Sequence, residues 1–173
     1  ILASKSTHCL ADLLQRHSSG ELAVDILGIL SNHRGQPERL AAQYGLPFEY
    51  LDIDSLGKAA AEERILTIMR DQQIDLTVLA RYMQILSDNF CQQASCPIIN
   101  IHHSFLPSFK GARPYHQAFA KGVKLVGATA HYVTPDLDEG PIIEQDVARV
   151  NHAMGALGLV EIGRDLEKAV LAR

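Results

Sequence analysis

The chain has 173 residues, 47% of them hydrophobic and 21% charged, and a formal net charge of −4. This length fits one domain with its own core, and the composition is ordinary for a globular protein. The acidic balance, without a basic cluster, argues against nucleic-acid binding, and no apolar run approaches the roughly 18–20 residues of a membrane span. The scattered Cys9, Cys91 and Cys96 form no Cys-x-x-Cys, which predicts reduced thiols in a cytoplasmic protein.

Apolar and helix-forming segments alternate along the chain. Short apolar runs predict strands at 1–3, 22–30, 48–51, 76–80, 98–101, 125–133 and 142–150. Helical spacing, with Thr7 and Ser87 as N-caps and Pro37 and Pro114 in first turns, predicts helices at 8–17, 37–44, 58–73, 88–93, 114–121 and 159–171. This alternation predicts an α/β fold, an open and mostly parallel twisted sheet with helices on both faces.

Both ends of the sequence look like internal points of a longer chain. Residues 1–3 read as the end of a strand with no Met before them, and residues 169–173 read as helix without a cap. We therefore expect one domain, residues 1–173, that is a fragment or the ordered part of a longer protein.

The run Ile98–Ile101, followed by His102, is the stretch most indicative of function. Side chains alternate between the faces of a strand, so Asn100 and His102 are expected to point the same way. Ligands of open α/β sheets bind at the carboxyl ends of the strands, and buried polar groups cost free energy unless they are bonded. The pair is therefore a candidate catalytic site, in which an amide donates to an oxyanion and an imidazole transfers a proton.

The loop 134–140 carries Asp136 and Asp138 between the last two predicted strands. From the residues alone, turn chemistry explains these aspartates better than function does. The loop is nevertheless placed to bring a carboxylate to the sheet edge near His102, where it would orient the imidazole and raise its basicity. His131, on the strand before this loop, is either a core histidine or a support for the loop.

Other polar side chains give weaker signals. Adjacent residues of a strand point to opposite faces, so His102 and His103 make poor joint metal ligands, and we expect no metal site. Lys110, Arg113 and His116 follow the central strand and either bind an acidic group or are solvated. Solvation fits Lys110, whereas Arg113, fixed before a proline, is the better anion-binding candidate.

Four motifs, taken together, resemble the formyltransferase domain of the 10-formyltetrahydrofolate enzymes. They are Asn-Ile-His at 100–102, Ser-Phe-Leu-Pro at 104–107, Gly111, and Leu-Asp-Glu-Gly-Pro-Ile-Ile at 137–143. The resemblance extends in order over nearly the whole chain. The deformylase branch of this family is favoured by the stretches 98–107, 111–118 and 127–133, with agreement at 79–83 and 163–165.

This resemblance implies a Rossmann-like fold and a hydrolase that converts 10-formyltetrahydrofolate and water to formate and tetrahydrofolate, which supplies formate for purine biosynthesis and balances one-carbon pools. It implies catalytic roles for Asn100, His102 and Asp138, no metal, no cofactor beyond the folate substrate, and an absent N-terminal ACT-type regulatory domain. We also expect a homo-oligomer. The expected substrate-binding residues are Met83, Gln84, Ile85, Leu86, Arg113, His131, Asp136 and Gly140.

The choice between hydrolysis and transfer depends on the acceptor of the formyl group. A ribonucleotide acceptor needs a phosphate cradle at the first strand–helix loop, but residues 4–9 contain no glycine. Water needs no cradle, so hydrolysis is favoured. Formyl transfer to a small amine, such as glycinamide ribonucleotide, and a catalytically silent folate-binding module are the alternatives.

Overall fold

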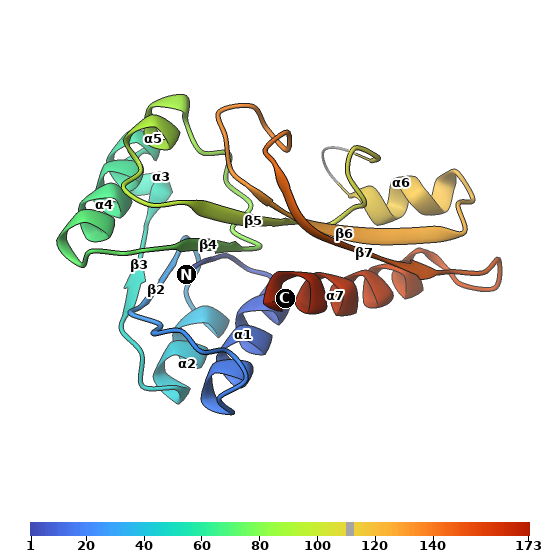
Figure 1. Ribbon diagram of the computed structural model, residues 1–173, viewed down its shortest axis with the longest axis horizontal. Helices are drawn as coiled ribbons and strands as arrows, with labels where there is room; N and C mark the ends of the chain where they lie inside the picture. Colours follow the sequence, from blue (N-terminus) through green and yellow to red (C-terminus); the bar gives the residue numbers. More distant parts are fainter. Residues whose placement is uncertain (110–112) are drawn as a thin grey trace.

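The computed structural model describes residues 1–109 and 113–173 (Figure 1). Within these residues the strands form one seven-stranded sheet in the order β3-β2-β1-β4-β5-β6-β7. The strands are β1 (Leu2–Ala3), β2 (Ile29–Ser31), β3 (Phe48–Tyr50), β4 (Thr77–Ala80), β5 (Ile98–His102), β6 (Leu125–Tyr132) and β7 (Ile142–Arg149).

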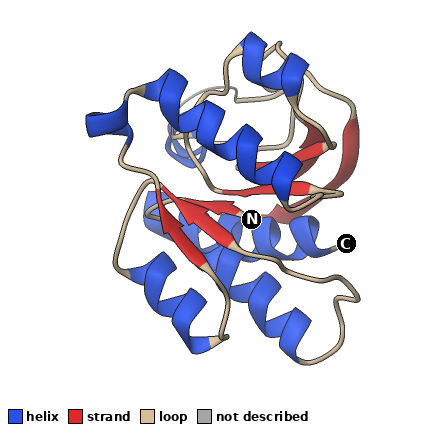
Figure 2. Cartoon of the chain, turned by 90° about the vertical axis from the view of Figure 1, so that its left-hand side faces the viewer, coloured by secondary structure: helices blue, strands red, loops and turns tan. Residues whose placement is uncertain are grey.

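Helices lie on both faces of the sheet, as the view along its edge makes clear (Figure 2). In Figure 1, α1, α2 and α7 lie on one face and α4 and α5 on the other. Among the described residues, none of the helices is long and apolar enough to cross a bilayer. The helices are α1 (His8–Ser18), α2 (Gln36–Gln43), α3 (Ile53–Leu56), α4 (Lys58–Asp71), α5 (Asp88–Gln93), α6 (Pro114–Ala120) and α7 (Ala156–Ala172).

The sheet has a parallel part and an antiparallel extension. The pairs β3-β2, β2-β1, β1-β4 and β4-β5 are parallel, whereas β5-β6 and β6-β7 are antiparallel. The prediction of a mostly parallel α/β sheet with helices on both faces is therefore confirmed. The antiparallel register sets His131 of β6 directly opposite Asn100 of β5.

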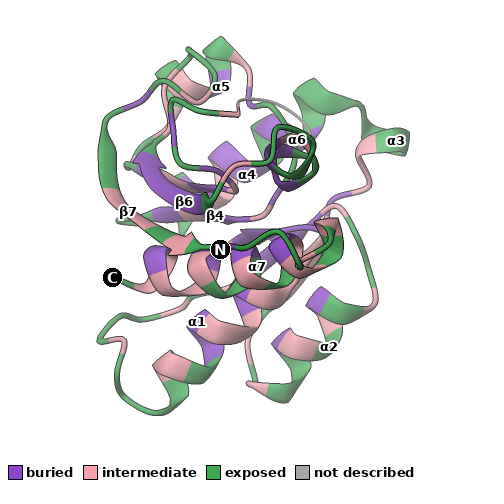
Figure 3. Cartoon of the chain, turned by 90° about the vertical axis from the view of Figure 1, so that its right-hand side faces the viewer, coloured by how far each residue is buried: buried purple, intermediate pink, exposed green. Residues whose placement is uncertain are grey.

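Apolar residues form buried cores, and Figure 3 colours the buried parts of the helices and strands purple. The face of β5 that carries Ile101 packs into a core with the apolar stripe of α1, residues Leu10, Leu13 and Leu14. Each fully buried leucine of this kind stabilises the fold by about 1.5–3 kcal/mol. Because side chains alternate along β5, this core leaves Asn100 and His102 on the opposite face.

Two local expectations are corrected by the structure. The strand expected at 22–30 is confined to Ile29–Ser31, because the preceding residues cross the surface irregularly and leave Val24 and Leu27 about half exposed. The segment 52–57, expected as loop, contains the short helix α3, whose N-cap Asp52 accepts a hydrogen bond from the Ser55 amide. Thr7 precedes α1 but makes no side-chain cap bond.

Candidate active site

A cavity of about 310 Å³ lies over the carboxyl half of β5. Its wall combines the segment after β4, the end of β5, and the end of β6 with the loop that leads to β7. The lining residues are Leu79, Arg81, 83–86, 100–103, His131 and 133–138. Segments far apart in the sequence thus meet at one place, and most of the polar residues expected at the site lie among them.

His102 and Asp138 form a carboxylate–imidazole pair at this cavity. Nδ1 of His102 lies 3.2 Å from Oδ1 of Asp138, and the two side chains are only 6% and 10% exposed. Burial alone would raise the pKa of the Asp138 carboxyl, but the hydrogen bond and the charge of His102 outweigh it, so this pKa lies below its usual value. Asp138 is therefore ionised at neutral pH and holds the His102 ring by Nδ1. Nε2 of His102 is buried without a hydrogen-bond partner among the described residues.

The Asp138 loop reaches His102 by a route that the sequence did not indicate. β6 runs antiparallel to β5, so it ends near the amino end of β5. The loop then folds back over the face of the sheet, while the Val133 amide donates to the Ile98 carbonyl. Asp138 itself adopts a left-handed backbone conformation, with φ of 57°. The expected meeting of the loop with His102 is found, but across the face of the sheet.

His131 fixes the amide of Asn100. Its Nδ1 lies 2.9 Å from the Tyr132 carbonyl and its Nε2 lies 3.3 Å from the amide nitrogen of Asn100. Burial lowers the pKa of His131, so the ring is neutral near pH 7. Since a carbonyl only accepts, Nδ1 carries the hydrogen and Nε2 accepts from Asn100. The second amide hydrogen of Asn100 is then available to a ligand.

The opposite wall of the cavity is largely apolar. Met83, Ile85 and Leu137 line it and are each more than half exposed, which is unusual for side chains of this type. Gln84, Leu86 and Asp136 complete this wall. An apolar cleft with a few polar groups is the typical form of a small-molecule site.

Backbone strain is concentrated around the cavity. Arg81, Met83 and Asp138 all have positive φ, at 63°, 56° and 57°, although none is glycine. Such conformations cost free energy and are found preferentially at functional sites. Here they turn the chain sharply after β4 and within the loop that carries Asp138.

Two residues expected at the substrate are not among the described residues that line the cavity. Arg113 is exposed at the start of α6, with φ of 53°. Gly140 is buried against β6, where a Cβ atom would collide with the Tyr132 carbonyl, so this glycine serves the close approach of two backbones. His116 is exposed on α6, whereas Lys110 and Gly111 lie outside the described residues.

The alternation rule fails at the end of β5. His102 and His103 both line the cavity, with ring centroids 5.2 Å apart, because the strand ends at His102 and the chain turns. His103 also meets the Tyr115 ring edge-on at 6.2 Å. Burial, and next the charge of Arg81, lower the pKa of His103 to about 3, so this ring is neutral.

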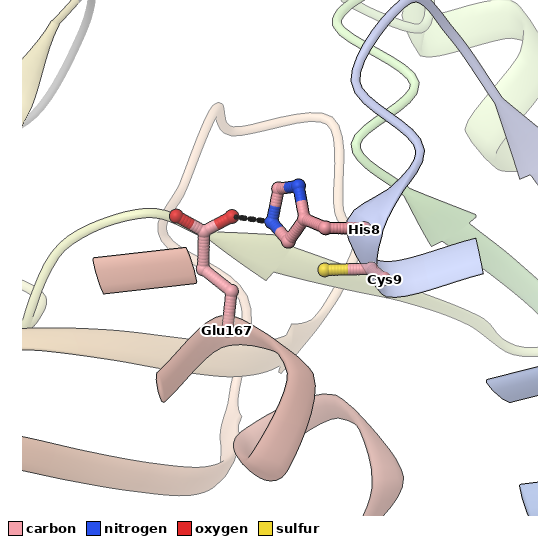
Figure 4. A group of neighbouring side chains, drawn as sticks. All are labelled: His8, Cys9 and Glu167. Atoms are coloured by element: carbon pink, nitrogen blue, oxygen red, sulfur yellow. Dashed lines mark hydrogen bonds and ion pairs between the residues drawn. The ribbon is translucent and has the colours of Figure 1, made fainter. Parts of the chain in front are cut away.

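A second group of polar residues, which the sequence analysis did not single out, lies between α1 and α7 (Figure 4). Glu167, only 1% exposed, accepts hydrogen bonds from His8 at 2.7 Å and from the Tyr115 hydroxyl at 3.0 Å. Its Oε2 lies 3.5 Å from Nε of Arg81. Burial would raise the pKa of Glu167, but these partners lower it, so the carboxylate is charged.

His8, Cys9 and Glu167 are the one group of three potential metal ligands found close together in the described part of the chain. The donor set does not suit a cation. The Arg81 guanidinium already lies beside Glu167, and burial raises the pKa of the Cys9 thiol, which keeps it protonated. The signal for this network in the sequence is a carboxylate within the apolar stripe of α7, between Leu159 and Val170.

The formyl transferase family model matches the sequence from residue 1 to residue 173. The chain belongs to the formyl transferase family. This domain is 54% identical over 170 residues to the formyltetrahydrofolate deformylase of Synechocystis sp., covering 98% of this chain and 59% of the relative. The crystal structure of a formyltetrahydrofolate deformylase from Pseudomonas syringae superposes with a TM-score of 0.94 at 50% identity, covering 99% of this chain and 57% of that one.

The formyl transferase fold is shared with proteins of another activity. A glycinamide ribonucleotide transformylase from Symbiobacterium toebii superposes with a TM-score of 0.91 at 27% identity, over 98% of this chain and 81% of that one. The resemblance is thus much closer in sequence to the deformylases. The chain spans between 55% and 61% of the length of the curated deformylases that it matches.

Proposed function

We propose that this domain hydrolyses 10-formyltetrahydrofolate to formate and tetrahydrofolate. The observation that carries the proposal is the His102–Asp138 pair at 3.2 Å beside the Asn100 amide, at the closed end of a largely apolar cavity. Relatives at about half identity over the full chain, which are named formyltetrahydrofolate deformylases, support the same substrate. Formate released by this reaction would supply purine biosynthesis and adjust one-carbon pools.

The three polar residues divide the chemistry between them. Asn100 donates its free amide hydrogen to the formyl oxygen, on which negative charge grows as water attacks the carbon. His102, held at Nδ1 by Asp138, takes the proton of the attacking water at Nε2. When the carbon–nitrogen bond breaks, His102 returns this proton to the folate nitrogen, and the second proton of the water is lost as formic acid ionises to formate.

The apolar wall would hold the pterin ring of the substrate. Met83, Ile85 and Leu137 leave exposed apolar surface at the cavity. Covering such surface with a flat ring gains about 25 cal/mol per Å² of apolar area removed from water. The positive φ of Met83 turns the backbone of 83–86 along the cavity, where its amides and carbonyls are placed to recognise the polar edge of the ring.

The first strand–helix loop supports water as the acceptor. Ser6 of this loop bonds to His8 at 3.2 Å, and Ser4 is buried. The loop contains none of the glycines that form a typical phosphate cradle. Transfer of the formyl group to a small amine is the alternative, and added amine discriminates between the two.

The wider setting of the domain belongs to the same proposal. The reaction as written uses no cofactor beyond the folate substrate. Three free cysteines fit a cytoplasmic location. An ACT-type regulatory domain elsewhere in the polypeptide and a homo-oligomeric state both stay predictions, which the full-length sequence and light scattering test.

The proposal is tested by mixing the protein with 10-formyltetrahydrofolate in the absence of any amine. We expect stoichiometric release of formate and tetrahydrofolate, and a loss of about 10²–10⁴ in rate for His102→Gln. The exposed His116→Gln is the matched control and should keep the wild-type rate. Release that requires an added amine would favour transfer, and folate binding without turnover would favour the silent module.

A further inference from the structure

One charged residue of the cavity wall has no part in the reaction as written above. Arg81 follows β4 directly, and its φ of 63° turns its side chain away from the course of the strand. The side chain is 14% exposed and borders the cavity together with His102 and His103. Its guanidinium therefore lies within the same chamber as the candidate catalytic residues.

The donors of Arg81 are not satisfied within the protein. Nε and Nη1 are buried and have no hydrogen-bond partner in the described part of the chain. The adjacent Glu167 offsets the charge of Arg81, with its Oε2 3.5 Å from Nε, and it also accepts from His8 and the Tyr115 hydroxyl at 2.7 and 3.0 Å. Nε therefore faces Glu167, and Nη1 is the buried donor of Arg81 that is left without an acceptor among the described residues. Because an unmet buried donor costs about 1–3 kcal/mol, the free N–H groups call for an acceptor that enters the cavity.

The ligand that fits is a small planar anion. A guanidinium presents parallel N–H groups whose spacing matches the two oxygens of a carboxylate, and it can only donate. The neighbouring His103 is neutral and adds no competing positive charge. Hydrolysis creates such an anion, because the attacking water gives the formyl carbon its second oxygen.

We propose that Arg81 forms a carboxylate subsite that binds the product formate, and that this subsite favours water over an amine as the acceptor. The inference rests on the proposed hydrolysis for the identity of the anion. A fixed guanidinium repels the ammonium form of an amine, whereas it binds the oxygen of water and of formate. Glu167, anchored by His8 and Tyr115, acts as the positioning residue that holds Arg81 toward the cavity.

The subsite is tested by titrating the folate-free protein with ¹³C-formate and observing binding by saturation-transfer NMR. We expect saturable binding to the wild type, a loss of about tenfold or more in affinity for Arg81→Gln, and a smaller loss for Arg81→Lys, which keeps the charge but not the fork. The control Arg70→Gln removes an exposed arginine that pairs with Glu63 and should bind formate as the wild type does.

Each result decides for or against the subsite. Absence of saturable formate binding to the wild type, or equal affinity in a folded Arg81→Gln, would overturn it. If Arg81→Gln does not fold, Arg81→Lys decides, since wild-type affinity in that variant excludes recognition by the fork. Because no folate is present, the titration stays interpretable if hydrolysis fails. Conversely, full hydrolysis with no effect of Arg81 on formate would reject the subsite and leave the proposed function intact.

The acceptor preference is measured separately, as the share of formyl groups that reaches an added amine such as glycinamide during turnover. The wild type should give formate alone. Arg81→Gln should divert a measurable share to the amine, and Arg70→Gln should not. A variant that hydrolyses more slowly while still yielding formate alone would contradict the role of Arg81 in acceptor choice.

Discussion

Two carboxylate–imidazole pairs lie on opposite sides of the same sheet edge and differ in how completely they are satisfied. Glu167, whose side chain is 1% exposed, pairs with His8 at 2.7 Å and also accepts from Tyr115. Asp138 pairs with His102 at a longer 3.2 Å from a strained loop, and Nε2 of that histidine lacks a partner among the described residues. The first pair holds elements together, and the second keeps bonding capacity for a ligand.

This difference shows how one type of pair serves either structure or chemistry. Both carboxylates have lowered pKa values, because in each case partners outweigh burial. The pKa direction alone therefore does not separate them. The separation comes from the unsatisfied Nε2 of His102, from the cavity that His102 and Asp138 both line, and from the strained backbone of Asp138 itself.

The largest effect is expected from Asp138→Asn. An amide at this position keeps the size of the side chain but removes the charge that holds His102, so the rate of formate release should fall by about 10³-fold. The midpoint of urea unfolding should change less than for Glu167→Gln, because Asp138 is less buried than Glu167. A loss of stability with retained specific activity would reverse the roles assigned to the two pairs.

Glu167→Gln should mainly lower the stability of the fold, whereas Asp138→Asn should mainly lower the rate. Removing this buried charge leaves Arg81 and His8 without their anion, which is expected to cost about 3–5 kcal/mol in the free energy of unfolding. Because the native carboxylate has a lowered pKa, its contribution is present above the ordinary glutamate pKa and is lost as pH falls through the native value. Urea titrations of the wild type and the variant at pH 7 measure the difference. A variant as stable as the wild type would show that the network is not structural.

The smallest of the three effects concerns His103. Its pKa is lowered from 6.5 to about 3, so between these values the unfolded chain binds a proton that the native state does not. The free energy of unfolding should therefore decrease as the pH is lowered through this window, by about 1.4 kcal/mol per pH unit. The His103→Gln variant lacks this pH dependence. Between pH 7 and pH 5 its free energy of unfolding, measured with urea, should therefore decrease by about 2 kcal/mol less than that of the wild type. Identical slopes would mean that His103 is protonated in the native state.

Much of the fold follows from local patterns, because strands and helices that bury one face show it in their spacing. The apolar positions of α1 and the Ser87 cap of α5 are found as expected. The strand predicted at 22–30 is wrong over most of its length, because apolar composition alone does not distinguish a strand from an irregular segment. The antiparallel placing of β6 depends on contacts between distant segments, which no local pattern contains.

The candidate site was predicted in part. Alternation along β5 and the strand-end rule placed Asn100 and His102 correctly in one cavity. Asp138 needed the family resemblance, because its residues alone favour a turn. Arg81 and Glu167 were not singled out, since a charged residue after a strand and another within a helix are common in sequences. Their significance depends on burial and missing partners, which only three-dimensional packing decides.

The segment 133–141 folds back over the sheet, and its length therefore determines where Asp138 lies. One end is pinned where the Tyr132 amide meets the Pro141 carbonyl, and the glycine at 140 permits that close fit. Each residue of extended chain spans about 3.3 Å, which is about the whole separation between the carboxylate and the imidazole. Adding or deleting a single residue there would move the carboxylate of Asp138 out of register with the imidazole of His102.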